Sequence, residues 1–199
     1  MKRIIFIVIL CHYFALGFAQ TGNVQQFKWE GDISIGLGMA DLKSEHFGIS
    51  GSSANVSMAI SRYFSDRIRL QLGLGASHFA SGSLYGSGYS NVKATFLEIP
   101  LKMRFYVWKS EQFKNKIAFG IGVQGNKSVA YSWNNNGNTL KDNNGAWFFN
   151  MPLEVGVELP ISLQNSLGIY LNAVYGNRAS KNYVLNNQSI LKLSLLYHF

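Results

Sequence analysis

Apolar and polar residues alternate along most of this chain, and this period of two constrains its fold more than any other feature. In residues 67–78, aliphatic side chains occupy every second position from Ile68 to Ala76, and the intervening positions hold arginine, glutamine, glycine and serine. Side chains with this period lie on opposite faces of a β-strand. The pattern predicts eight strands, at residues 28–39, 53–64, 67–78, 95–107, 116–133, 147–159, 166–178 and 189–199.

The connections between these strands alternate between short and long. Short polar turns fall at 65–67, 108–115 and 160–165, and longer loops rich in Gly, Asn and Ser fall at 41–51, 80–91, 134–145 and 178–188. An even number of strands with short turns at one end and long loops at the other is typical of bacterial outer-membrane barrels. We therefore predict an all-β fold, an eight-stranded antiparallel up-and-down transmembrane β-barrel.

The polar face of the strands is unusual because it combines charges with glycine. A secreted β-sandwich would also alternate, but its solvated face has no reason to select glycine, which weakens strands. A narrow barrel lumen does, because long side chains opposite need room. The glycines on this face are Gly36, Gly38, Gly73, Gly75, Gly120, Gly122, Gly156, Gly168 and Gly176. We predict a structural polar network in the lumen that comprises Glu30, Asp32, Arg69, Glu98, Lys102, Arg104, Glu154, Glu158 and Lys192.

Aromatic residues gather near both ends of the predicted strands, as expected where strands cross two membrane interfaces. One group, near the short turns, comprises Phe27, Trp29, Phe64, Phe105, Trp108, Tyr197 and Phe199; the other, near the long loops, comprises Phe79, Tyr131, Trp133 and Trp147. Arg62 and Lys127 interrupt the apolar face, but both lie near strand ends, where a long side chain can reach the interface.

The first 19 residues have the pattern of a secretory signal peptide. Lys2 and Arg3 precede a short apolar run, and Gly17-Phe18-Ala19 supplies small residues before a cleavage point. The apolar run is too short for a membrane anchor, and His12 interrupts it. Lipidation at Cys11 is disfavoured because Leu10 stands where a small residue is needed. We expect a signal peptide at 1–19, a short segment at 20–26 and a barrel at 27–199 in the outer membrane.

The expected mature chain is basic and free of cysteine. The formal net charge is +8, and +6 without Lys2 and Arg3. The basic residues are scattered singly, which argues against a nucleic-acid partner. Without cysteine, no disulfide can stabilise the exported chain, so we expect other interactions to stabilise it.

Three segments resemble the outer-membrane β-barrel domain family, also called PorT-like. Residues 96–105 (FLEIPLKMRF) resemble its "YLEIPL" strand, with Phe96 in place of tyrosine, and residues 63–71 (YFSDRIRLQ) resemble a strand–turn–strand segment of the family. Residues 191–199 (LKLSLLYHF) resemble the last strand of most outer-membrane barrels. This resemblance implies that Tyr197 and Phe199 form a C-terminal signal that the barrel-insertion machinery reads. It implies fold and location, and no activity.

No pattern in the chain predicts a cofactor, a metal or a catalytic site. Residues 120–125 (GIGVQG) match the dinucleotide fingerprint, but strand residues follow where the motif needs a helix. His46, His78 and His198 lack metal-ligand spacing. Ser77 and His78 are adjacent in a strand and face opposite ways. The strongest enzyme alternative, a lipid-A-modifying barrel, would need Asp41, Ser44, His46 and Ser50 of the first long loop.

By elimination, the sequence favours a structural or surface-binding protein. Eight strands leave no open channel, so a transport pore is disfavoured. The long loops offer Tyr85, Tyr89, Trp133 and Asn134–Asn136 for a protein or glycan partner, and the barrel wall would contact outer-membrane lipid and lipopolysaccharide. Two alternatives stay open, a lipid-A-modifying enzyme and a subunit of a larger secretion or transport assembly.

Overall fold

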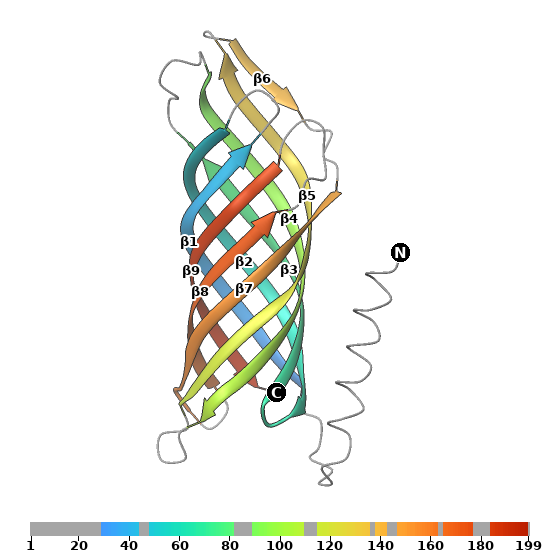
Figure 1. Cartoon of the computed structure of the whole chain (residues 1–199), viewed down its shortest axis with the longest axis vertical. Coiled ribbons are helices and arrows are strands. Elements are labelled where there is room, and N and C mark those ends of the chain that lie inside the picture. Colours follow the sequence, from blue (N-terminus) through green and yellow to red (C-terminus); the bar gives the residue numbers. More distant parts are fainter. Residues whose placement is uncertain are drawn as a thin grey trace.

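The chain folds into a tall cylinder of antiparallel strands (Figure 1). The computed structural model describes residues 29–43, 48–81, 89–109, 115–135, 138–142, 147–162, 165–176 and 184–198. The strands are β1 (Trp29–Lys43), β2 (Gly48–Ser65), β3 (Ile68–Ala80), β4 (Tyr89–Lys109), β5 (Lys116–Asn135), β6 (Asn138–Asp142), β7 (Trp147–Pro160), β8 (Asn165–Gly176) and β9 (Val184–His198). Among the described residues, no helix is long and apolar enough to cross a membrane.

Backbone pairing closes the sheet on itself. Starting at Trp29 of β1, successive partners are Arg62, Leu70, Met103, Ile121, Leu153, Ala173 and Ser189, and the last of these pairs with Met39, again in β1. The register therefore returns to β1 ten residues further along (39 − 29). Ten residues along a strand measure about 33 Å, and eight strands side by side measure about 38 Å. The ratio of these two lengths corresponds to a strand tilt of about 40° from the barrel axis, as in other closed barrels.

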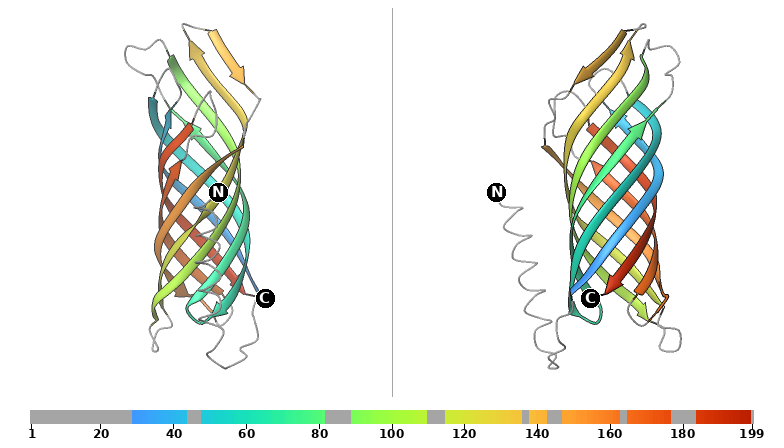
Figure 2. Two further views of the ribbon diagram at one scale, coloured as in Figure 1. Left: turned by 45° about the vertical axis from the view of Figure 1, so that its right-hand side comes forward. Right: turned by 180° about the vertical axis from the view of Figure 1, so that it is seen from behind.

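The eight strands predicted from alternation are all present, and all but β8 are longer than predicted. Asp41–Lys43 and Gly48–Gly51 continue the β1–β2 ladder into the first predicted loop, and β6 lies within the predicted loop 134–145. In these extensions apolar residues are sparse, with Leu42, Ile49 and Leu140 among polar neighbours, so the hydrophobic alternation is interrupted although the backbone ladder continues. Figures 1 and 2 show β5 and β6 rising above the ends of the other strands.

The apolar residues of the strands face outward and the charged residues face inward. Leu37 is 66% exposed and Leu74 is 64% exposed, whereas Arg69 is 0% and Glu158 is 2% exposed. A β-sandwich buries its apolar residues between two sheets, so this arrangement excludes the sandwich alternative.

The predicted aromatic belts are confirmed only in part. Trp29, Phe64 and Trp108 are exposed near the lower ends of the strands, and Trp147 is exposed toward the upper end. Phe79 and Tyr131, however, are buried inside the barrel, so their assignment to the outer face was wrong. Phe79 shares the inward side of β3 with Arg69. In β5, a bulge adds one residue beside the Thr95–Phe96 step, and this reverses the side on which Tyr131 emerges.

Phe105 is half-buried in β4, where it pairs with Ile68 and Phe119. The other predicted aromatic residues cannot be placed. Phe27 and Phe199 lie outside the described residues, and only the backbones of Trp133 and Tyr197 are described.

Glycines on the inner face make room for the large side chain of Tyr170. A Cβ atom at Gly156 would collide with the Tyr170 ring and with the Ile169 carbonyl, and one at Gly168 would also collide with that ring. Gly125 faces outward, where a Cβ would lie at an ordinary 3.5 Å from the Phe149 ring. Crowding inside the barrel therefore explains why glycine stands at Gly156 and Gly168.

We predict that Gly156→Ala destabilises the barrel, whereas Gly125→Ala, its matched control, leaves stability almost unchanged. Overpacking a close-packed interior costs about 1–3 kcal/mol. The measurement is urea unfolding of refolded protein, followed by the gel mobility of unheated samples. Equal midpoints for the two variants would show that the lumen around Tyr170 is not tightly packed.

Candidate functional site: the three layers of the barrel lumen

The lower part of the lumen is filled with ion pairs, and Arg69 of β3 forms the first group. Its guanidinium binds the Asp32 carboxylate directly and lies 3.5 Å from Glu30 Oε2 and 3.6 Å from Glu158 Oε1. Ser61 and Gln71 also donate to Asp32. All these side chains are buried. A buried charge is tolerated only when it is paired and hydrogen-bonded, and this group meets that condition for Asp32.

Arg104 of β4 organises the second group. Its Nε donates to Glu154 Oε1 at 2.8 Å and its Nη1 donates to Glu158 Oε1 at 3.1 Å. Its guanidinium also lies 4.2 Å above the ring centre of Tyr170. Lys102 Nζ donates to the other oxygen of Glu154, Oε2, at 2.9 Å. Arg104 therefore links the two carboxylates of β7, whereas Lys102 contacts only one of them.

Three tyrosines complete this layer, and the sequence analysis did not single them out. Tyr106 and Tyr170 both donate to Glu158 Oε1, the former at 3.0 Å, and Tyr63 stacks on Tyr106 with ring centres 5.9 Å apart. Lys116 donates to Tyr63 at 3.3 Å. Tyr106 lies two residues after Arg104, and Tyr170 lies two residues after Gly168, so each tyrosine shares the inward side of its strand. The alternation of the sequence was therefore sufficient to place both tyrosines inside the barrel.

The middle layer is polar but largely uncharged. It contains Glu98, Gln124, Asn126, Asn150 and Asn172, all buried. Gln124 Nε2 donates to Asn126 Oδ1 at 2.7 Å, but the side-chain nitrogen and oxygen of Asn150 have no hydrogen-bond partner among the described residues. Buried polar groups of this kind are commonly satisfied by ordered water. We expect water molecules in this layer.

An apolar cluster closes the upper part of the lumen. Phe96 and Phe148 meet edge to face with ring centres 5.6 Å apart. The full cluster comprises Ala40, Phe79, Val92, Ala94, Phe96, Tyr131 and Phe148, each at most 5% exposed. The described lumen thus has an ion-paired layer, a polar layer and an apolar layer in sequence along the barrel axis.

The structure places eight of the nine predicted network residues inside the barrel. Seven of them form the two ion-paired groups, and Glu98 lies apart in the middle layer. Lys192 lies in β9, where its backbone pairs with Gly36 and Tyr170, and its side chain is outside the described part. Of the predicted C-terminal signal, Tyr197 lies in β9, and Phe199 is outside the described residues.

The structure describes the candidate chemical motifs in part. Residues 120–125 lie within β5, with no helix after them. Ser77 is buried and His78 is exposed, with His78 Nδ1 3.0 Å from Thr95 Oγ1. Ser50 donates directly to Asp41, whereas Ser44 and His46 lie outside the described residues. Within the described part of the chain, no group of three metal-binding side chains comes together.

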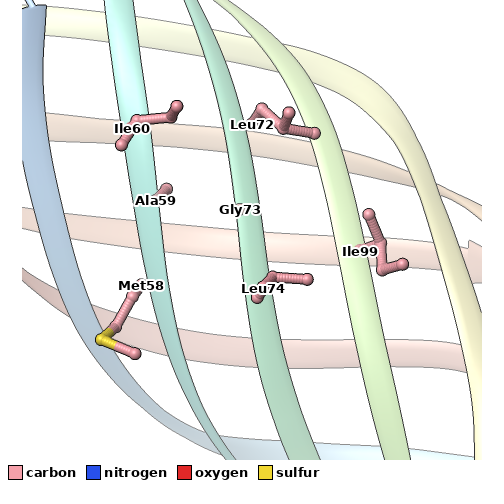
Figure 3. A pocket seen from close by; sticks show the side chains of 7 residues that line it. All are labelled: Met58, Ala59, Ile60, Leu72, Gly73, Leu74 and Ile99. Atoms are coloured by element: carbon pink, nitrogen blue, oxygen red, sulfur yellow. The ribbon is translucent and has the colours of Figure 1, made fainter.

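The outer wall carries a shallow groove over β2, β3 and β4 (Figure 3). Two cross-strand pairs, Ile60–Leu72 and Met58–Leu74, flank it, and Ile99 lies at one side. Its lining is wholly aliphatic apart from the Met58 thioether. The groove offers contact to an apolar chain and no group for catalysis.

No protein-family model matches the chain, and no curated protein matches it. Among solved structures, it is similar to Neisserial surface protein A, with 10% identity, a TM-score of 0.53, and coverage of 85% of this chain and 97% of that one. It is also similar to a major outer membrane protein from Thermus thermophilus, with 13% identity, a TM-score of 0.53 and coverage of 86% and 99%. All three chains share the barrel fold.

A third similar structure is the N-terminal β-barrel domain of Pseudomonas aeruginosa OprF, with 10% identity and a TM-score of 0.50. The match covers 87% of this chain and all of that domain. At such identities the likeness concerns the fold alone.

We predict that Arg104→Met destabilises the barrel by about 3–5 kcal/mol, because it leaves Glu158 and Glu154 short of a buried partner. Lys102→Met should cost less than half as much, because Glu154 keeps Arg104. Urea unfolding in detergent measures both variants. Equal losses would contradict the central position of Arg104.

Proposed function

We propose that this chain is an integral outer-membrane β-barrel protein with a sealed lumen and a structural or surface-binding role at its long-loop end. The observation that carries the proposal is the continuous apolar outer wall. In β1 alone, Ile33, Ile35, Leu37 and Met39 are between 54% and 69% exposed. Water-soluble monomers rarely expose apolar patches on this scale, and a bilayer removes the cost.

The height of the apolar wall fits a bilayer. Trp29 and Met39 are ten residues apart along a strand tilted by about 40°, which spans about 25 Å along the barrel axis. The apolar band of outer-membrane barrels is about 25 Å tall. At the lower edge, the Arg62 guanidinium lies 5.5 Å from the Trp29 ring centre, an arrangement suited to an interface.

Three further features support the outer membrane as the location. Residues 1–19 have the pattern of a cleaved signal peptide, and the C-terminal segment ends in aromatic residues at Tyr197 and Phe199. The structures with the same fold include outer-membrane proteins. The segments at 63–71, 96–105 and 191–199 support membership of the PorT-like group within this class.

The layers of the lumen support a barrel without an open pore. An ion carried through it would have to break the contacts of Arg69 or Arg104 and then pass between Phe96 and Phe148. Both steps are unfavourable in a narrow channel with little water. We propose that solute transport is not its role.

We also propose that the chain is not an enzyme. Acyl transfer needs a serine that is hydrogen-bonded to a histidine base, and a carboxylate that is hydrogen-bonded to the same histidine and orients it. Asp41 instead accepts a hydrogen bond directly from Ser50, which occupies the carboxylate without a histidine between them. Asp41 and Ser50 thus form a cross-strand contact in the β1–β2 ladder, which supports this proposal.

The membrane assignment is tested with single cysteines in the expected mature chain, which has none of its own. A fluorophore on Leu72→Cys should be quenched by lipids that carry a spin label on the acyl chain, because Leu72 is 49% exposed near mid-height of the apolar wall. A fluorophore on Thr139→Cys of β6 is the matched control and should escape this quenching. Absence of quenching at Leu72 would contradict the membrane assignment.

The sealed lumen predicts that vesicles containing the protein do not swell in small sugars or amino acids. The measurement is the light-scattering rate of proteoliposomes against protein-free vesicles, with a general porin as positive control. The double variant Phe96→Ala/Arg104→Ala should raise the swelling rate, because it removes one large side chain from the apolar layer and one from the ion-paired layer. Rapid swelling with the native protein would refute the sealed barrel.

A further inference from the structure

Three lysines lie together on the outward side of the barrel, above the apolar wall. Lys93 of β4 and Lys141 of β6 both pair in register with Ser132 of β5 and are exposed. Lys127 of β5 lies below them and pairs with Trp147. We name Lys93, Lys127 and Lys141 the lysine face.

The described outward side chains around these lysines carry no negative charge. At the described outward positions of β3 to β7 above Leu97, none of the side chains is an aspartate or a glutamate. On β2, the upper outward positions are Ser52, Ala54 and Val56. Among the side chains that the structure describes at this height, the lysines lie on β4, β5 and β6.

The lysine face continues downward into exposed apolar residues. Leu97 and Trp147 are both 47% exposed, and both pair in register with Lys127. Phe149 is 61% exposed, and its ring and that of Trp147 flank Gly125. One vertical strip of wall therefore offers an apolar surface below and cations above, which is the polarity of a phospholipid or glycolipid molecule.

The heights of the lysines match the headgroup layer. Lys127 pairs with Leu97 at the top of the apolar wall, and Lys93 lies four residues above Leu97 in β4, about 10 Å higher at about 2.5 Å of axial rise per residue. Headgroups occupy about 5–8 Å on each side of the hydrocarbon core. Lys127 is thus at the lower edge of this layer. Lys93 and Lys141 lie just above its outer edge, where their flexible side chains can reach down to it.

We propose that the lysine face binds the phosphate groups of a lipid-A-type glycolipid in the outer leaflet, with its acyl chains against Leu97, Trp147 and Phe149. Lysine is a compact cation suited to phosphate, and opposite charges at a membrane surface attract over about one Debye length. This inference rests on the proposed function and names a binding partner for the upper end of the barrel. A free phosphate ion would not contact the apolar residues below the lysines.

The test compares binding of diphosphoryl lipid A and of chemically dephosphorylated lipid A to the full mature chain in nanodiscs. The native protein should prefer the diphosphoryl form about tenfold. Lys93→Gln/Lys141→Gln should remove this preference, and Lys127→Gln should reduce it. The matched control is Arg67→Gln/Lys109→Gln, which removes two positive charges at the opposite end and should keep the preference.

The inference would be overturned by an unchanged preference in Lys93→Gln/Lys141→Gln or by an equal loss in the control. Equal binding of phosphatidylglycerol would indicate a site for any anionic lipid and would overturn it as well. Competition by millimolar inorganic phosphate would assign the lysine face to the free anion and would also overturn it. Insertion into vesicles is measured separately for each variant. Failure of the native chain to insert would refute the proposed function, whereas insertion without phosphate preference would refute only the lipid contact.

Discussion

The pairing of buried charges inside the barrel is the constraint on which the rest of the structure depends. Arg69, Arg104 and Lys102 face a narrow interior with little bulk water, and Asp32, Glu154 and Glu158 lie within contact distance of them. Removing one partner from such a group is costly, because it leaves an uncompensated charge. The pairs join β1, β3, β4 and β7, strands that are not all neighbours in the ring. They thereby connect opposite walls of the barrel without a disulfide.

The packing around these pairs explains the distribution of glycine. Tyr170 lies against Gly156 and Gly168, where any Cβ would collide with its ring, and Gly120 leaves space for Glu154. A glycine on a strand facing a large side chain is thus part of the polar network, although it makes no polar contact itself. The cost of glycine in a strand is offset by the closure of the ring, which leaves no free edge in the membrane region.

The two ends of the barrel differ in a way that bears on function. The lower end contains the ion pairs and tyrosines, whereas the upper end contains an apolar cluster inside and lysines outside. With the sealed lumen that we propose, the function of the protein lies at its outer surfaces. The β4–β5–β6 extension rises above the ends of the other strands (Figure 2). Together with the wall below it, this extension offers a surface with exposed apolar residues and lysines.

The sequence by itself determined the strands, their alternation and the residues that face the lumen, because a period of two along a strand is a local property. It could not determine where strands end above the wall, since β6 carries a single apolar residue, Leu140, and shows no alternation. Nor could it place Tyr131, whose side depends on a bulge in the β4–β5 ladder. The sequence also could not determine which charged side chains pair with one another. Which carboxylate meets Arg104 depends on the ten-residue stagger of the closed ring, and only the tertiary structure fixes that stagger.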